Sequence, residues 1–167
     1  MATVKHRFGP RDASFPASNF AQYKAVSGSS YPVESLAFND TTEESCYFQF
    51  PAVNYGSGNI TVRLRWYADT ASTNGVVFGA SIAAITPNSD SQDIETDGLA
   101  TENTGSDTHI GTTGQRLHDM TITVSNLDSI AADDWCVLKL ARKVANGSDT
   151  MTGDCCVVEI GIEYSDT

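Results

Sequence analysis

A period-two alternation of apolar and polar residues constrains this chain more than any other feature. In "ITVRLRWY", residues 60–67, every second residue from Ile60 to Trp66 is apolar, whereas Arg63 and Arg65 fall on the other phase. A β-strand points successive side chains to opposite faces, so this period predicts a strand with one buried face. Such a strand needs a core on one side and water or a partner on the other.

The same period recurs along the chain, and turn-forming residues separate the repeats. The segments that share it are 31–38, 44–50, 59–69, 75–85, 116–127, 134–144 and 153–164. The turn "NYGSGN" predicts that the second and third of these segments pair as a hairpin. Seven or eight strands without a long helix predict an all-β fold, a two-sheet antiparallel β-sandwich, in one domain over residues 33–167.

The four cysteines lie in strand segments and are predicted to be buried thiols. Cys46, Cys136 and Cys156 share the apolar phase of their segments, and Cys155 falls on the opposite phase. In the last segment this assignment also places Val158 inward. Because no CxxC spacing is present, we expect no metal site.

The N-terminal residues 1–32 have no sustained period and are predicted to form an extended arm. They carry a net charge of +3, and because the total is -11, the other 135 residues carry -14. A basic arm that contains scattered aromatic side chains is suited to docking on an acidic neighbour, although a solvated tail is the simpler alternative. The candidate contact residues of this arm are Lys5, Arg7, Phe8, Arg11, Phe15 and Phe20.

A long polar loop is predicted at residues 86–109, and it holds six acidic residues without a lysine or arginine. Loops of this length are functional or disordered more often than shorter ones. The stretch from Asp93 resembles the start of a calcium-binding loop, but its twelfth position is Thr104 where such a loop requires glutamate. We therefore favour a solvated or partner-binding loop over a calcium site.

The sequence contains no catalytic signature, and we expect no catalytic residues and no cofactor. The three histidines lie outside any nucleophile or metal motif, and His118 is expected to be a packed strand residue. A body of charge -14 disfavours nucleic acid as a partner, and no apolar run reaches the length of a membrane span.

Trp135 falls on the outward phase of its strand, whereas Trp66 falls on the inward phase. An outward tryptophan is a candidate stacking platform for a sugar ring. A carbohydrate-binding β-sandwich is therefore one hypothesis for function. Its candidate stacking platforms are Trp66, Trp135, Tyr47 and Tyr67, and the outward phase makes Trp135 the main candidate glycan-stacking residue.

Four stretches give the chain a resemblance to small virion structural proteins of tailed bacteriophages. They are "FGPRD…FPASNFAQY", "LAFNDTTEESCYFQFPAVNY", "ITVRLRWYAD" and "ANGSDTMTGDCCVVEIGIEY". The resemblance implies a jelly-roll sandwich and a capsid decoration (cement) protein that stabilises the outer capsid surface. It also implies a homotrimer, the major capsid protein as partner, and a location on the virion after synthesis in the bacterial cytoplasm. A tail or fibre component is the alternative within this group.

The resemblance gives the outward arginines two alternative roles. Arg63 and Arg65 are candidate contacts to an acidic loop of the next copy or of the capsid. Alternatively, they pair with Glu159 or Glu163 and hold neighbouring strands of one sheet together.

Overall fold

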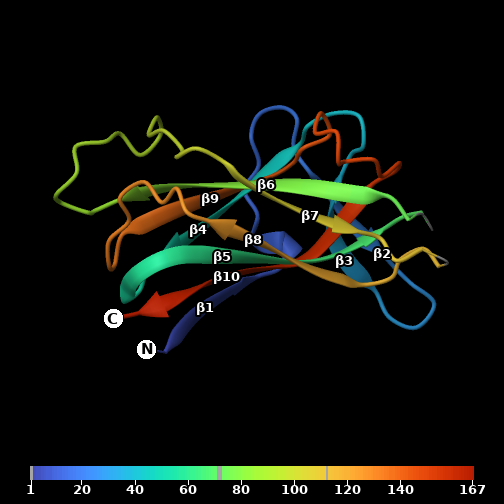
Figure 1. Ribbon diagram of the computed structural model, residues 1–167, viewed down its shortest axis with the longest axis horizontal. Helices are drawn as coiled ribbons and strands as arrows, with labels where there is room; N and C mark the ends of the chain where they lie inside the picture. Colours follow the sequence, from blue (N-terminus) through green and yellow to red (C-terminus); the bar gives the residue numbers. More distant parts are fainter. Residues whose placement is uncertain (1, 71–72, 112) are drawn as a thin grey trace.

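The computed structural model describes residues 2–70, 73–111 and 113–167, and it shows two antiparallel β-sheets packed face to face (Figure 1). No helix in the described residues is long and apolar enough to cross a membrane. The elements are β1 (Thr3–Phe8), η1 (Pro10–Asp12), β2 (Gln22–Val26), β3 (Val33–Phe38), β4 (Ser45–Pro51), β5 (Tyr55–Ala68), β6 (Gly75–Ile85), β7 (Asn103–Thr108), β8 (His118–Val124), β9 (Trp135–Arg142) and β10 (Cys155–Asp166).

The first sheet, sheet A, has the order β2-β3-β10-β5-β8, and β1 pairs with β10 beyond the end of β3. The second, sheet B, has the order β4-β9-β6-β7. The two chain ends lie side by side, and the backbone N–H of Asp166 donates to the carbonyl of Ala2 at 3.1 Å (Figure 1). The termini are therefore both at one end of sheet A.

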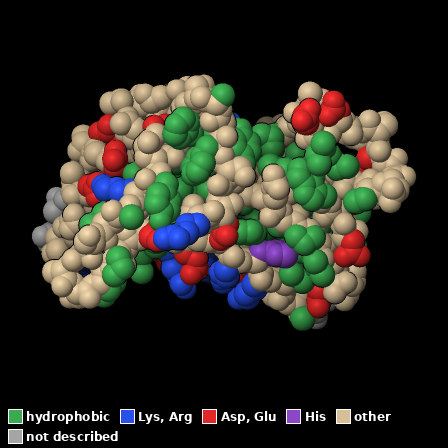
Figure 2. Space-filling view, turned by 180° about the vertical axis from the view of Figure 1, so that it is seen from behind, with side chains coloured by type: hydrophobic (Ala, Val, Ile, Leu, Met, Phe, Trp, Pro, Cys, Tyr) green, Lys and Arg blue, Asp and Glu red, His purple; other side chains and the backbone are tan. Residues whose placement is uncertain are grey.

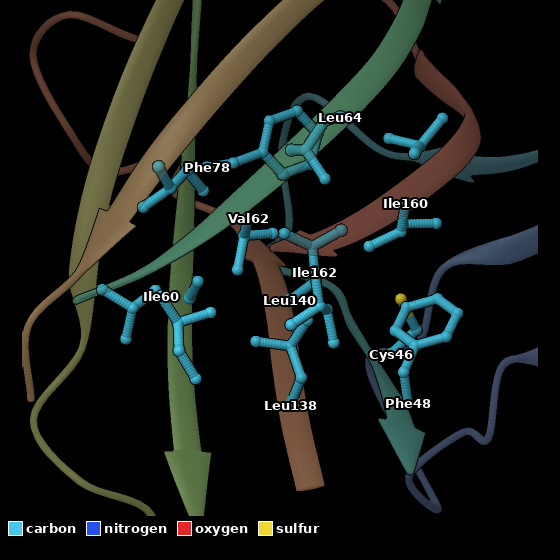
Figure 3. Packing of buried hydrophobic residues seen from close by; sticks show 14 of the residues in the cluster. Cys46, Phe48, Ile60, Val62, Leu64, Phe78, Leu138, Leu140, Ile160 and Ile162 are labelled. Atoms are coloured by element: carbon cyan, nitrogen blue, oxygen red, sulfur yellow. The ribbon is translucent and has the colours of Figure 1, made fainter. Parts of the chain in front are cut away.

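The core lies between the sheets and is built by the inward phase of each strand. Figure 3 shows Val62, Ile160 and Ile162 of sheet A facing Phe78 and Leu138 of sheet B. The burial of β8 alternates residue by residue along its whole length, as the sequence period predicted. The two-sheet antiparallel β-sandwich is thus confirmed, and jelly-roll connectivity stays a prediction.

The expected extended arm, residues 1–32, is instead part of the sandwich. β1 pairs with β10 over six residue pairs, and β2 pairs with β3. Between them, Ser14 and Phe20 form isolated bridges to β4 in the other sheet. The segment crosses from sheet A to sheet B and back, because the open edges of both sheets offer unpaired backbone groups that it satisfies.

The expected hairpin between segments 44–50 and 59–69 is also wrong. β4 pairs with β9 in sheet B, whereas β5 pairs with β10 and β8 in sheet A. The turn between them carries the chain from one sheet to the other. Alternation assigns a buried face to each strand but does not say which sheet supplies the partner.

A bulge in β10 reverses the predicted phase at its start. The register of β10 against β5 shifts between Val157 and Glu159. As a result Cys155 and Val157 join the main core, while Cys156 joins a small cluster on the other face with Tyr67 and Ala37. The inward assignment of Cys156 and Val158 was therefore wrong. All four cysteines are buried free thiols, as expected.

The predicted loop at 86–109 is shorter than expected, because its last part forms the strand β7. This strand pairs with β6 from Gly75↔Thr108 to Ala80↔Asn103. A side chain at Gly105 would lie 2.8 Å from the carbonyl of Thr121, so β7 passes directly against β8 of the other sheet. A polar strand of this composition has no apolar period to reveal it.

Candidate binding groove

A groove of about 460 Å³ lies on the outward face of sheet B. Its floor comes from three adjacent strands: Tyr47 and Gln49 on β4, Trp135 and Val137 on β9, and Ala83 and Ile85 on β6. The register places Gln49, Val137 and Ala83 side by side in one row across the sheet. Trp135 and Ile85 lie side by side in the next row.

The floor is apolar on a face that usually carries polar side chains. Along β9 the buried residues Cys136 and Leu138 point into the core, and the half-buried Trp135 and Val137 therefore point outward. Sheets that face water on one side commonly expose polar residues there. An apolar row on the outer face, partly covered by flanking segments, is a feature typical of a binding surface.

One wall of the groove is residues 14–16. The backbones of Ser14 and Tyr47 exchange two hydrogen bonds of 2.8 and 2.9 Å, which fix this segment along the edge of β4. Phe15 lines the groove with 43% of its surface exposed, and its ring centroid lies 5.9 Å from that of Phe20. The aromatic side chain of this wall therefore packs against a second ring.

The opposite wall is residues 94–99 of the acidic loop. The backbone N–H of Ala100 donates to the carbonyl of Ile82 at 2.8 Å, which ties the loop to β6 just before β7 begins. The N–H groups of Thr96 and Asp97 both donate to the carbonyl of Asp93 and close a compact turn. In Figure 1 the loop, drawn in yellow-green, stands clear of the sheets at one end of the molecule.

A buried carboxylate holds the tryptophan end of the floor. Asp134 is 1% exposed, and it accepts hydrogen bonds from the hydroxyl of Thr86 at 2.7 Å and from the N–H of Ala131 at 2.6 Å. These bonds join the start of β9 to the end of β6 directly beside Trp135. Asp128 adds a bond from the N–H of Ala84 at 3.0 Å. The indole is thus presented by a rigid part of the sheet.

The charge of the groove is negative. Glu95 and Asp97 line it, and none of the described lining residues is lysine, arginine, histidine or cysteine. Figure 2 shows red acidic side chains on the lobe at the upper right, which is the loop seen from behind, next to green hydrophobic side chains. The groove therefore offers aromatic faces, an amide, hydroxyls and carboxylates, and it contains no histidine base or cysteine nucleophile.

Arg63 and Arg65 lie on the outer face of sheet A, far from the groove. Arg65 pairs with Glu159 at 3.2 Å, and Arg63 pairs with Asp119 and, at 3.6 Å, with Glu163. The alternative in which these arginines hold neighbouring strands together is the arrangement that the structure contains.

The basic residues of β1 add to these ion pairs on the outer face of sheet A. Arg7 donates to Glu163 at 2.7 Å, and Lys5 lies 3.6 Å from the same carboxylate. These contacts, with the hydrogen bond from Arg7 first, lower the pKa of Glu163. Arg11 pairs with Glu34.

The aromatic contact candidates are divided between the core and the groove. Phe8 packs on the core, with its ring centroid 5.4 Å from that of Phe48. Phe15 was predicted to contact a partner, and it lines the groove instead, with its ring packed against that of Phe20.

Of the stacking candidates, Trp135 and Tyr47 lie in the groove floor, whereas Trp66 and Tyr67 are buried elsewhere. Gln49 was missed as a lining residue, although its outward phase on β4 was visible in the sequence.

The histidines are packing residues. His118 is 8% exposed, and its ring is stacked on Trp66 at a centroid distance of 4.5 Å. His6 lies 3.0 Å from the hydroxyl of Tyr164. In the part of the chain that the structure describes, no three histidine, cysteine, aspartate or glutamate side chains are placed to hold a metal ion.

A second hollow, of about 650 Å³, lies on the outer face of sheet A. Tyr31, 71% exposed, stands at its rim, and the ion pair between Lys24 and Asp69 lies within it. Its single exposed ring comes from the connection between β2 and β3, not from a strand. The groove on sheet B is the better candidate for a binding site. Two of its aromatic side chains, Tyr47 and Trp135, lie on strands, and the third, Phe15, lies in a segment that is hydrogen-bonded to β4.

No protein-family model and no curated protein sequence matches the chain. Among solved structures, the carbohydrate-binding module TmCBM27, described for specific mannan recognition, has a TM-score of 0.50 at 6% identity over 99% of both chains. The C-terminal CBM6 of LamC from Zobellia galactanivorans has a TM-score of 0.46 at 16% identity, covering 95% of this chain and 98% of that one. The family 11 carbohydrate-binding module from Clostridium thermocellum has 0.46 at 11%, covering 96% and 87%. At these identities the similarity shows the fold alone.

The expected function as a capsid decoration protein is wrong. The finding that overturns it is the fold similarity to TmCBM27, which is a carbohydrate-binding module and not a virion protein. The chain's resemblance to virion proteins, the homotrimer and the virion location stay predictions.

Proposed function

We propose that this chain is a non-catalytic carbohydrate-binding β-sandwich whose ligand lies in the groove on the outer face of sheet B. The observation that carries the proposal is the aromatic lining of the groove. Trp135 lies in the floor, Tyr47 lies on the neighbouring strand, and Phe15 forms part of one wall. The apolar face of a sugar ring stacks on such side chains, and their polar tips accept or donate hydrogen bonds at the rim.

The remaining lining supplies hydrogen-bonding groups around this aromatic lining. The amide of Gln49 both donates and accepts, the hydroxyl of Ser14 does the same, and Glu95 accepts. A site with an apolar floor and a few convergent polar groups is the usual composition of a small-ligand site. The volume of about 460 Å³ lies within the range of roughly 300–1,000 Å³ that such sites have.

The walls also suit an extended ligand. They stand on the two sides of a floor three strands wide, one along β4 and one along β6. A chain of sugars would therefore run roughly parallel to the strands. The carbohydrate-binding modules that share the fold are consistent with this class of ligand and do not specify which sugar is bound.

The first prediction is that Trp135→Ala abolishes retention of the protein on the polysaccharide that it binds. Loss of one stacked ring removes about 1.4 kcal/mol or more of binding free energy, a factor of roughly ten in affinity. The measurement is affinity electrophoresis of wild type and variant through gels containing soluble polysaccharides, followed by calorimetry with oligosaccharides of the retained type.

The matched control is Tyr31→Ala, which removes the exposed ring of the second hollow. It should leave retention unchanged. If Tyr31→Ala abolished retention and Trp135→Ala did not, the ligand would lie in the hollow on sheet A. Absence of retention of the wild type on every polysaccharide tested would refute the proposed function.

A further inference from the structure

The negative charge of the groove is uncompensated, and this determines which ligands it can hold. Glu95 and Asp97 line it, and within the described ranges neither carboxylate takes part in an ion pair. The outer face of sheet A is different, because there Arg63 and Arg65 neutralise Glu159 and Asp119. The outer face of sheet A is therefore largely neutralised around these arginines, whereas the groove on sheet B keeps its negative charge.

The cations nearest along the strands of sheet B do not compensate the groove. Lys143, which follows β9, is already paired with Glu43 at 2.6 Å and with Glu102 at 2.9 Å. Lys139 lies on the outward phase of β9, two residues beyond Val137 and opposite Tyr47 of β4, and it is not part of the lining. Two residues along a strand correspond to roughly 7 Å. The described lining thus presents two carboxylates and no cation to an anionic group on a bound sugar, and Lys139 lies outside it, beside Tyr47.

From this arrangement, and resting on the proposed carbohydrate binding, we infer that the groove takes glycans that carry no anionic group. The carboxylates of Glu95 and Asp97 accept hydrogen bonds from sugar hydroxyls or from protonated amines, and they repel carboxylate and sulfate groups. The expected order of affinity for one sugar backbone is amine-bearing, then uncharged, then anionic. The net charge of -11 adds a weaker, long-range repulsion of the same sign.

The test uses pairs of polysaccharides that share a backbone and differ in charge. Suitable pairs are hydroxyethyl cellulose with carboxymethyl cellulose, methyl-esterified with de-esterified pectin, and chemically desulfated with native carrageenan. Chitosan with chitin oligosaccharides adds an amine-bearing arm. Affinity electrophoresis at low salt should retain the protein at least about tenfold more strongly on the uncharged member of the pair that it recognises. Stronger retention on the anionic member, abolished by Trp135→Ala, would overturn the inference and leave the proposed function intact.

Charge variants separate the wall from the net charge of the molecule. Glu95→Gln with Asp97→Asn should bring affinity for the anionic member to within about threefold of that for its uncharged partner. The control, Asp119→Asn with Glu159→Gln on the outer face of sheet A, changes the net charge equally and should leave the tenfold discrimination in place. Added salt should also reduce discrimination by the wild type, because it screens the repulsion.

Each outcome is distinguishable. Equal discrimination by wild type and the Glu95 and Asp97 variant would show that these carboxylates do not select the ligand. Equal loss of discrimination in the control variant would assign the effect to net charge. Retention on no member of any pair would refute the proposed carbohydrate binding itself, and the inference with it.

Discussion

Arg142 is a fully buried charged residue, so its guanidinium needs a partner for every donor. The guanidinium donates to both carboxylate oxygens of Asp149, at 3.1 and 2.9 Å. Its remaining hydrogen bonds go to the carbonyls of Phe38, Met151 and Gly153. All five donors of the side chain are used, so the charge is buried at the cost of desolvation but without an unsatisfied group.

We predict that Asp149→Asn lowers the free energy of unfolding by about 3–5 kcal/mol, because it leaves a buried guanidinium without its counter-charge. Urea titration of wild type and variant measures the difference. Arg11→Gln is the matched control: it breaks the ion pair to Glu34 at a side chain that is 73% exposed, and should change the free energy of unfolding far less than Asp149→Asn does. A similar, small effect of both substitutions would show that the buried pair contributes no more than a surface one.

His118 gives the stability a dependence on pH. Its ring packs against Trp66 and His109. Burial, and then the charge of His109, lower its pKa from the ordinary value of 6.5. The charges of Asp107 and Arg116 also affect its pKa, which Asp107 raises and Arg116 lowers. As the pH falls, His118 therefore becomes protonated in the unfolded chain at a higher pH than in the folded protein.

We predict that stability is retained above pH 6.5 and falls as the pH decreases from 6.5 toward the lowered pKa of the folded state. His118→Gln should reduce this slope, measured by thermal unfolding at steps between pH 8 and pH 5. The pKa of His6 is lowered as well, so His6→Gln serves as a parallel variant and the double variant should be the least sensitive. A slope unchanged by His118→Gln would contradict the assignment.

At the scale of elements, β5 and β10 each carry core residues on one face and paired charged residues on the other. Their inward residues are fully buried, and their outward residues alternate in charge: Glu159 is opposite Arg65, and Glu163 is opposite Thr61 with Arg63 two residues away. Gly161 sits between the two glutamates, and the Arg7 side chain lies in the space that a Cβ there would occupy. Cross-strand pairs of this kind each contribute a few tenths of a kcal/mol to about 1 kcal/mol.

We predict that Arg63→Gln with Arg65→Gln lowers the free energy of unfolding by about 1–2 kcal/mol and leaves the mass of the protein in solution unchanged. The reason is that both side chains are engaged by carboxylates of their own sheet. Light scattering after size exclusion, at low and high salt, gives the mass. If the variant shifted from a trimer to a monomer, these arginines would be subunit contacts after all.

At the scale of the whole molecule, the two outer faces have different compositions. The face of sheet A carries compensated pairs of arginine and glutamate beside a hollow with Tyr31 at its rim, whereas the face of sheet B has an apolar floor between an aromatic wall and an acidic one. The walls come from residues 14–16 and 94–99, about eighty positions apart in the chain. The groove therefore exists only when the sandwich is closed and both connections are attached to its edges.

The N-terminal segment shows why part of this arrangement escaped prediction. In β1 the inward residues are Val4, His6 and Phe8 and the outward ones are Lys5 and Arg7, so a period of two is present. A histidine in the apolar phase concealed it, and the glycine and proline that follow ended the run. β7 had no apolar phase at all, because it is stabilised by its pairing with β6 and not by side-chain burial.

The sequence by itself determined the class of fold, the buried face of most strands, the buried thiols and the outward position of Trp135. These follow from local alternation, because the pleat of a strand assigns every side chain to a face. Tertiary structure alone decided which strands pair, where the bulge in β10 reverses the phase, and which distant segments stand beside Trp135. Pairing and wall formation depend on backbone hydrogen bonds and on contacts between remote residues, and neither has a local periodic signal.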